Sequence, residues 1–284
     1  MPTAYNNIAI PDFMYGTAWK KEATTSLVEL AVRTGFTAID TANQLRHYDE
    51  VRVGEALLSL RKEGVEREKL FLQTKFTSVD GQGGHTPYDA RADLTTQVKQ
   101  SMDSSLQHLH TDYVDSYVLH GPYSRRGLKA EDWEVWGAIE EQYRSGKARM
   151  IGASNVTGEQ LAELCARAKV KPMVVQNRCY AVTAWDKEVR DICKEHNIIY
   201  QGFSLLTANA NVMHSALVRS IAQRANATTA QVIFKFALQV GMLPLTGTSN
   251  EQHMREDLQS DRLTLTKDEV EQLIYGDSSV EFVR

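Results

Sequence analysis

Short, strongly apolar runs alternate along the chain with longer stretches in which apolar and polar residues follow a helical spacing. The runs have the length and composition of parallel strands that are covered on both faces. Eight such runs occur, at residues 13–17, 37–41, 70–75, 114–120, 148–154, 173–177, 198–204 and 243–248. The pattern therefore predicts eight strands.

Between the strands lie segments whose apolar residues recur three and four positions apart, as on one face of a helix. These segments are residues 25–33, 92–109, 131–145, 156–168, 185–196, 217–225 and 230–240. Gly35 and Gly146 follow the first and third segments, where a helix commonly ends. We expect two further helices in the later part of the chain.

This order of elements predicts an α/β fold. Eight strands separated by helices, without a linker or a low-complexity segment, indicate a (β/α)8 TIM barrel that spans residues 1–284 as a single domain. A doubly wound open sheet is the alternative. Such a sheet usually carries G-x-G-x-x-G after its first strand, and that string does not occur here. The barrel is favoured.

Composition excludes several classes of protein. A net charge of −4, a pI near 6.1 and scattered basic residues argue against a nucleic-acid partner. Cys165, Cys179 and Cys193 lack C-x-x-C spacing, which disfavours zinc-finger and disulfide-rich proteins and suits a reducing cytosol. No apolar run reaches the roughly 18 residues of a membrane helix. The N-terminus lacks the features of a signal peptide, so we expect a cytoplasmic protein without a membrane partner.

Titratable residues end three consecutive predicted strands. Asp40, Lys75 and His120 end the second, third and fourth strands, so they should be neighbours at the face where barrel enzymes carry their reactive groups. Each alone has an ordinary explanation, as a helix cap, a solvated lysine or a hydrogen-bonded histidine. Together they indicate a site, because a partly buried Asp and Lys need one another.

Five segments resemble signatures of the aldo-keto reductase family. They follow the family's order and cover residues 35–42, 48–57, 72–75, 113–120 and 146–155, within a resemblance that runs from about Gly16 to Leu258. The resemblance implies an NAD(P)H-dependent oxidoreductase that reduces aldehydes and ketones to alcohols. It also implies a small-molecule carbonyl substrate, no metal, and a monomer or a weak homo-oligomer.

The family's catalytic residues map onto Asp40, Tyr48, Lys75 and His120. By resemblance, Tyr48 is the general acid and base, Lys75 lowers the pKa of its phenol, and Asp40 holds Lys75 charged and oriented. His120 is expected to orient the carbonyl oxygen of the substrate.

The spacing around Tyr48 leaves two alternatives open. Tyr48 lies farther beyond Asp40 than the corresponding Tyr of the family, and the usual spacing, counted back from Gly54, falls on His47. We favour a small loop insertion that returns Tyr48 to the site, because no other Tyr lies nearby. In the alternative, Tyr48 packs on the surface and His47 faces the cofactor.

The resemblance implies that the cofactor is NADPH, with NADH as an alternative. A Ser-Asn pair and a Gln would hold the nicotinamide amide, and an aromatic residue of the seventh strand would stack on its ring. The residues expected to bind the cofactor are Gly16, Thr17, Ala18, Asp40, Ser154, Asn155, Gln176, Phe203, Ser204, Leu206, Gly247, Thr248, Ser249, His253, Glu256 and Asp257. Gly247 and His253 stand where many relatives use a Lys and an Arg for the 2′-phosphate, which leaves dual cofactor use open.

The expected substrate wall combines aromatic residues with two of the catalytic ones. Its members are Trp19, Tyr48, His120, Tyr123 and Trp133, with Trp136 as the alternative to Trp133. Longer relatives enclose the substrate with a C-terminal loop, whereas this chain has only residues 277–284 after Gly276. The resemblance therefore implies a more open pocket.

Two other functions remain as alternatives. The potassium-channel β subunits resemble reductases and keep the cofactor while serving a membrane partner, so turnover of a simple aldehyde would separate the two functions. An aldolase could use Lys75 in a Schiff base. The Ser154, Asn155 and Gln176 matches argue against the aldolase.

Overall fold

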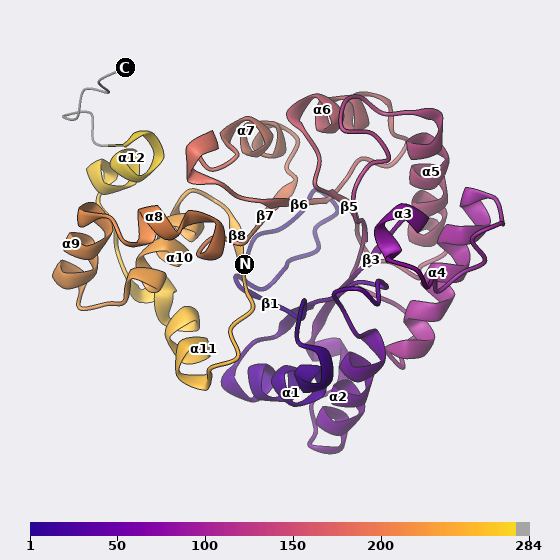
Figure 1. The fold of residues 1–284 in the computed structure, drawn as a ribbon, viewed down its shortest axis with the longest axis horizontal. Helices are drawn as coiled ribbons and strands as arrows, with labels where there is room; N and C mark the ends of the chain where they lie inside the picture. Colours follow the sequence, from indigo (N-terminus) through magenta and orange to yellow (C-terminus); the bar gives the residue numbers. More distant parts are fainter. Residues whose placement is uncertain (277–284) are drawn as a thin grey trace.

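The computed structural model describes residues 1–276, and the tail on which the open-pocket expectation depends, residues 277–284, lies outside the described residues. Eight parallel strands close into a barrel in chain order, with β8 paired to β1 (Figure 1). The strands are β1 (Met14–Gly16), β2 (Ala38–Asp40), β3 (Phe71–Phe76), β4 (Ser116–Leu119), β5 (Ile151–Ser154), β6 (Val174–Arg178), β7 (Ile199–Phe203) and β8 (Leu243–Thr246). All eight predicted strands are present, and the predicted barrel is confirmed.

Helices surround the ring of strands (Figure 1). They are α1 (Thr24–Thr34), α2 (Glu50–Lys62), α3 (Val79–Gln82), α4 (Leu94–His108), α5 (Ala130–Arg144), α6 (Gly158–Arg167), α7 (Lys187–Glu195), α8 (Ala210–Met213), α9 (Ala216–Ala225), α10 (Thr229–Gln239), α11 (Glu251–Leu258) and α12 (Lys267–Tyr275). The seven predicted helices correspond to α1, α4, α5, α6, α7, α9 and α10, whereas α2 and α3 were not predicted as helices.

Side-chain caps set the starts of several helices. The hydroxyl of Thr157 accepts the backbone N–H of Gln160 at 3.2 Å, and the Gln160 side chain accepts the backbone N–H of Thr157 at 3.0 Å. This reciprocal pair satisfies two backbone donors at the start of α6. Thr228 and Gln231 repeat the arrangement at α10. Such caps fix where the chain leaves the rim of the barrel and enters a helix.

Apolar residues close the end of the barrel where the strands begin. Met14, Ala38 and Phe71 start β1, β2 and β3, and they pack with Ala4 and Ile10 of the N-terminal segment. In Figure 1 this segment runs across the centre of the ring. Polar groups of the barrel interior are consequently concentrated toward the ends of the strands.

Three features bear on function classes. Cys165, Cys179 and Cys193 are buried and free. Among residues 1–276, no helix is long and apolar enough to cross a membrane. In the same part of the chain, no three His, Cys, Asp or Glu side chains are grouped to hold a metal ion.

Candidate active site

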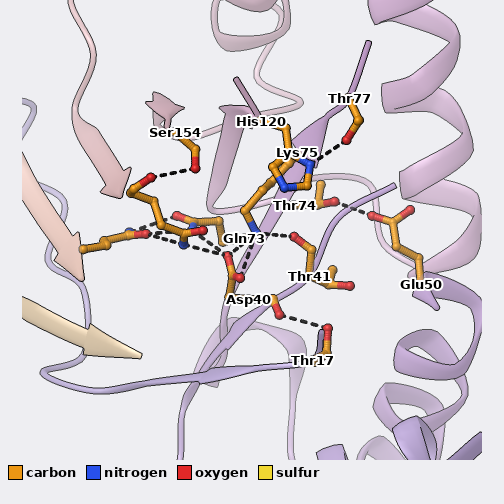
Figure 2. A network of polar contacts seen from close by, with 12 residues as sticks. Thr17, Asp40, Thr41, Glu50, Gln73, Thr74, Lys75, Thr77, His120 and Ser154 are labelled. Atoms are coloured by element: carbon orange, nitrogen blue, oxygen red, sulfur yellow. Dashed lines mark hydrogen bonds and ion pairs between the residues drawn. The ribbon is translucent and has the colours of Figure 1, made fainter. Parts of the chain in front are cut away.

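The three titratable residues predicted at the strand ends lie together. Asp40 is the last residue of β2, Lys75 lies near the end of β3, and His120 directly follows β4. Figure 2 shows the three side chains converging at one end of the barrel. The parallel pairing of β2 with β3 and of β3 with β4 brings these neighbouring strand ends together.

Lys75 and Asp40 form a buried ion pair. Nζ of Lys75 lies 2.7 Å from Oδ1 and 2.7 Å from Oδ2 of Asp40, and it donates a third hydrogen bond to the carbonyl oxygen of Thr41 at 2.8 Å. Burial lowers the pKa of Lys75, while the Asp40 carboxylate opposes that shift. Because all three ammonium protons are engaged and the side chain is fully buried, Lys75 is poorly placed to attack a carbonyl as an aldolase lysine would.

Two buried glutamines also bind the Asp40 carboxylate, and a third glutamine links them to each other. Gln73 and Gln176 donate through Nε2 to Oδ1 of Asp40 at 2.8 and 3.0 Å. The same two nitrogens donate to Oε1 of Gln201 at 2.8 and 2.9 Å, and Gln201 returns a hydrogen bond to Gln73 at 3.0 Å. A carboxylate that accepts several hydrogen bonds is stabilised in its charged form. The network therefore fixes the position of Asp40.

Tyr48, and not His47, lies beside Lys75 and His120. The Tyr48 ring meets the His120 ring edge-on, with 5.9 Å between ring centroids, and Nζ of Lys75 lies 5.1 Å from the centre of the Tyr48 ring. His47 instead stacks on Trp19, with 4.0 Å between ring centroids. The geometry favours the inserted-loop interpretation over the one in which His47 replaces Tyr48.

A tight turn and the start of α2 place Tyr48. Its backbone N–H donates to the carbonyl oxygen of Gln44 at 3.0 Å. The next residue, Asp49, caps α2 by accepting a backbone N–H of the first turn at 3.1 Å. Glu50 is buried and accepts hydrogen bonds from the hydroxyls of Thr74 on β3 and Ser105 on α4. Tyr48 comes directly before this cap, so the fixed start of α2 restricts its position.

Burial sets the protonation states of Tyr48 and His120. The pKa of Tyr48 is raised above its ordinary value, first because the phenol is buried and second because Asp40 lies near it. The net shift is therefore upward, opposite to the lowering that we expected from Lys75. Burial, aided by the Lys75 charge, lowers the pKa of His120 to about 3. At neutral pH the site therefore holds a protonated phenol and a neutral imidazole.

His120 is held on three sides. Its Nδ1 lies 2.7 Å from the hydroxyl oxygen of Thr77, and its backbone N–H donates to the carbonyl oxygen of Phe76 at 2.9 Å. Its carbonyl oxygen accepts the side-chain amide of Asn155 at 2.8 Å. The ring is therefore fixed relative to β3 and to the end of β5.

The residues expected to hold a nicotinamide amide lie next to one another. Nδ2 of Asn155 donates to Oγ of Ser154 at 3.1 Å, and that hydroxyl donates to the carbonyl oxygen of Gln176 at 2.6 Å. Asn155 has a positive φ of 56°, which turns the chain sharply after β5. These bonds, with those of Gln176 to Asp40 and Gln201, engage the side-chain donors of the three residues. The amide oxygens of Asn155 and Gln176 are left to accept the N–H groups of a carboxamide.

The expected phosphate end lies between β8 and α11. Asn250 caps α11 by accepting the backbone N–H of His253 at 3.0 Å. The amino group of Lys20, from the connection between β1 and α1, donates to the carbonyl oxygen of Gly247. A cationic side chain beside the start of a helix fits the negatively charged phosphates of a dinucleotide. Lys20 thus supplies a positive charge at the position where Gly247 lacks one.

The other residues expected to bind the cofactor lie at or just beyond strand ends or in α11, and one of them, Asp257, is buried. Phe203 ends β7 half-buried, with the guanidinium of Arg178 at 5.6 Å from its ring centre, and Ser204 after it has a positive φ of 57°. Asp257 is buried and accepts the hydroxyl of Thr246 at 2.7 Å, so it supports the end of β8. The remaining expected residues lie at or just beyond strand ends or in α11, namely Gly16, Thr17, Ala18, Leu206, Thr248, Ser249 and Glu256.

The expected substrate wall is only partly assembled. A cavity of about 240 Å³ adjoins Tyr48 and is lined by Trp19, Lys21, Glu22, Leu45, Arg46, His47, Tyr48, Asp49 and Arg52. Trp133 lies under the guanidinium of Arg167 from α6, at 4.3 Å, and thus faces a neighbouring helix. Trp136 is buried core, with its indole N–H donated to Val170. The Tyr123 hydroxyl is buried without a hydrogen-bond partner among the described residues.

Sequence reasoning missed four residues of this site: Thr77, Gln73, Gln201 and Lys20. A signal for two of them existed. Alternate residues of a strand face the same side, so Gln73 lies on the same face of β3 as Lys75, and Thr77, directly after β3, continues the same alternation. Lys20 had no comparable signal, because its position depends on the path of a loop.

Comparisons with known proteins identify the family of the chain. The model of the aldo/keto reductase family matches residues 13–274. Glyoxal reductase of Bacillus subtilis is 30% identical over 272 residues, which cover 95% of this chain and 90% of that protein. The NAD/NADP-dependent indole-3-acetaldehyde reductase of Schizosaccharomyces pombe is 28% identical, with 94% and 90% covered. The crystal structure of an aldo-keto reductase from a deep-sea metagenome library superposes with a TM-score of 0.83 at 22% identity, covering 98% of this chain and 96% of that one.

Proposed function

Because the chain belongs to the aldo/keto reductase family, we propose that it reduces aldehydes and ketones to alcohols with NADPH, and that Tyr48 donates the proton. Its membership in the family makes the chain an oxidoreductase that acts on carbonyls with a nicotinamide cofactor. The placement of the Tyr48 phenol beside Lys75 and His120 supports Tyr48 as the proton donor.

Ser154, Asn155 and Gln176 would hold the carboxamide of the nicotinamide, and Lys20 would lie at its phosphates. When bound, the cofactor supplies the hydride that reduces the carbonyl carbon. The choice of NADPH over NADH rests on the family resemblance. His253 and Gly247 offer a 2′-phosphate less charge than the Arg and Lys of many relatives, and Lys20 is the cation beside Gly247.

Tyr48 and His120 would act on the carbonyl oxygen. Burial keeps the phenol protonated at neutral pH, so Tyr48 has a proton to give to the oxygen as it becomes an alkoxide. The neutral His120 ring can donate a hydrogen bond to the same oxygen and thereby orient it. Lys75 would stabilise the negative charge that the phenol acquires after it has given up its proton.

A pair of variants tests the assignment of Tyr48. Initial rates of NADPH oxidation would be measured with a series of aldehydes for the wild-type protein, Tyr48→Phe and His47→Ala. We expect Tyr48→Phe to lose about a hundredfold or more in turnover and to bind NADPH as tightly as the wild type. We expect His47→Ala to keep most of its turnover, because the His47 ring stacks on Trp19.

Two results would contradict the proposal. Full turnover in Tyr48→Phe together with loss in His47→Ala would return the proton donor to His47. Binding of NADPH by the wild type with no oxidation by any aldehyde would favour the channel-subunit type of function instead. The same assay with NADH would test the cofactor preference. The cytoplasmic location and the monomeric or weakly oligomeric state remain predictions from the sequence.

A further inference from the structure

Thr77 and His120 are joined by a short hydrogen bond that the function above leaves unexplained. The hydroxyl oxygen of Thr77 lies 2.7 Å from Nδ1 of His120 (Figure 2). Thr77 follows β3 and His120 follows β4, and these two strands pair at Phe76 and Leu119. The contact thus joins two strand ends at the rim that also holds Lys75.

The contacts of the Thr77 backbone and methyl group restrict its hydroxyl to one orientation. Its carbonyl oxygen accepts the phenol of Tyr88 at 2.7 Å and the side-chain amide of Gln82 at 3.1 Å. Its methyl group lies against Gly81, where a Cβ would come within 2.7 Å of it. Because a threonine side chain has few χ1 rotamers, fixing the backbone and the methyl group also fixes the hydroxyl.

The hydrogen bond can be formed in two ways. Either the hydroxyl donates to Nδ1 and the ring proton sits on Nε2, or Nδ1–H donates to the hydroxyl oxygen. In the second arrangement the hydroxyl hydrogen of Thr77 needs another acceptor. Thr77 is buried, and its hydroxyl has no other partner among residues 1–276. The first arrangement leaves Nε2–H of His120 without a partner among residues 1–276 instead, but the His120 side chain is only partly buried whereas Thr77 is buried. An unsatisfied donor costs more where it is more deeply buried, so the first arrangement is preferred.

The ring of His120 carries a single proton at neutral pH. Burial and the charge of Lys75 lower its pKa to about 3, so the doubly protonated ring is not formed near pH 7. The position of that one proton decides the role of the ring. Nε2–H is a donor that attracts a carbonyl oxygen, whereas a bare Nε2 presents a lone pair that repels it.

We propose that Thr77 is a positioning residue that donates its hydroxyl hydrogen to Nδ1 and so holds His120 in the Nε2–H tautomer. The ring then offers the carbonyl oxygen a donor at all times. This role rests on the proposed reduction, but the tautomer itself is a property of the protein alone.

Thr77→Val and Thr77→Ser test the proposal. Valine has nearly the shape of threonine without the hydroxyl, and serine keeps the hydroxyl. The tautomer would be read from two-bond ¹H–¹⁵N correlations of ¹⁵N-histidine-labelled protein, with the His120 signals identified by their loss in His120→Asn. We expect Nε2–H in the wild type and in Thr77→Ser, and a shift toward Nδ1–H in Thr77→Val.

Turnover provides the second measurement. We expect kcat for an aldehyde to fall about tenfold or more in Thr77→Val, as for loss of one donor to a developing oxyanion, with the Kd of NADPH unchanged and Thr77→Ser close to the wild type. An Nδ1–H signal in the wild type would overturn the proposal. A slow Thr77→Val that keeps the Nε2–H tautomer would overturn it as well. A wild type that shows Nε2–H and reduces no carbonyl would refute the proposed function while supporting the role of Thr77 in fixing the tautomer.

Discussion

Nζ of Lys75 lies 2.7 Å from both carboxylate oxygens of Asp40, inside the barrel and out of contact with water. Removing one member of such a pair leaves the other as an unpaired buried charge, which typically costs about 3–5 kcal/mol. The pair thus couples the stability of the fold to the chemistry proposed for its rim.

Lys75→Met should damage both properties. We expect turnover to fall about a hundredfold or more and the free energy of unfolding in urea to fall by about 3–5 kcal/mol. The double variant Asp40→Asn/Lys75→Met should recover much of the stability, because it removes both charges. It should recover none of the turnover. A double variant as unstable as Lys75→Met would show that the ion pair is not the source of the loss.

His253→Arg should change the cofactor preference. Arg255 already pairs with Glu251 at 2.5 Å, so it does not replace the missing guanidinium. A new guanidinium at position 253 can form charge-assisted bonds to a 2′-phosphate, which NADH lacks. We expect NADPH to bind about tenfold more tightly and NADH to change little. Equilibrium titration of both cofactors would measure this, with Gln252→Arg as the control of equal charge. Equal gains for NADPH and NADH would mean that position 253 lies away from the phosphate.

Gly54→Ala should destabilise the protein through packing alone. A Cβ at Gly54 would lie 1.9 Å from the carbonyl oxygen of His108, so α2 and the end of α4 would have to separate. Overpacking of this kind costs typically 1–3 kcal/mol. Gly137, in α5, is the matched control, because nothing lies within 4 Å of its Cβ position. Gly137→Ala should stabilise the protein by roughly 0.5–1 kcal/mol. Urea unfolding would contradict the packing argument if both changes had the same sign.

Asp257 should make stability depend on pH. Burial raises its pKa to about 6, above the ordinary value near 3.9. The folded state therefore binds this proton more tightly than the unfolded state. The resulting contribution to stability is complete below about pH 4 and is lost as the pH rises through about 6.

Replacing Asp257 by Asn removes this dependence and keeps an acceptor for Thr246. Each pKa unit corresponds to about 1.4 kcal/mol, so we expect a gain of roughly 2–3 kcal/mol at pH 8. Only a small gain is expected at pH 4, where Asp257 is protonated in the folded state and about half protonated in the unfolded state. The exposed Asp112→Asn serves as the control in unfolding experiments without cofactor. A gain that is the same at both pH values would rule out titration of Asp257 as the cause.

The positions of residues that depend only on the pattern of their own strand or helix could be predicted from the sequence. The eight strands were found because each is apolar on both faces, and Asp40, Lys75 and His120 followed as their polar ends. The helix α2 was missed because Gly54 interrupts its helical pattern. That glycine is required by a neighbouring helix that is distant in sequence, which no local pattern reveals.

The orientation of Tyr48 depended on a loop. The usual spacing, counted back from Gly54, fell on His47, and Tyr48 was favoured only because no other Tyr lies nearby. The position of Tyr48 beside Lys75 follows from a turn closed by the carbonyl oxygen of Gln44. The Gln73–Gln201 contact joins opposite sides of the barrel and becomes visible only when the barrel closes. Contacts between side chains that are far apart in the sequence, and that form only when the barrel closes, are the part of the site that could not be predicted from the sequence.

The buried cysteines have a consequence for the chemical durability of the protein. Aldehydes and related carbonyl compounds are electrophiles, and thiolates are the side-chain nucleophiles that react with them most readily. Burial raises the pKa of Cys165 to about 11 and of Cys179 to about 12, and it raises that of Cys193 further. Each sulfur therefore stays protonated and shielded from solvent. A reductase built in this way can work among reactive carbonyls without being alkylated at its own cysteines.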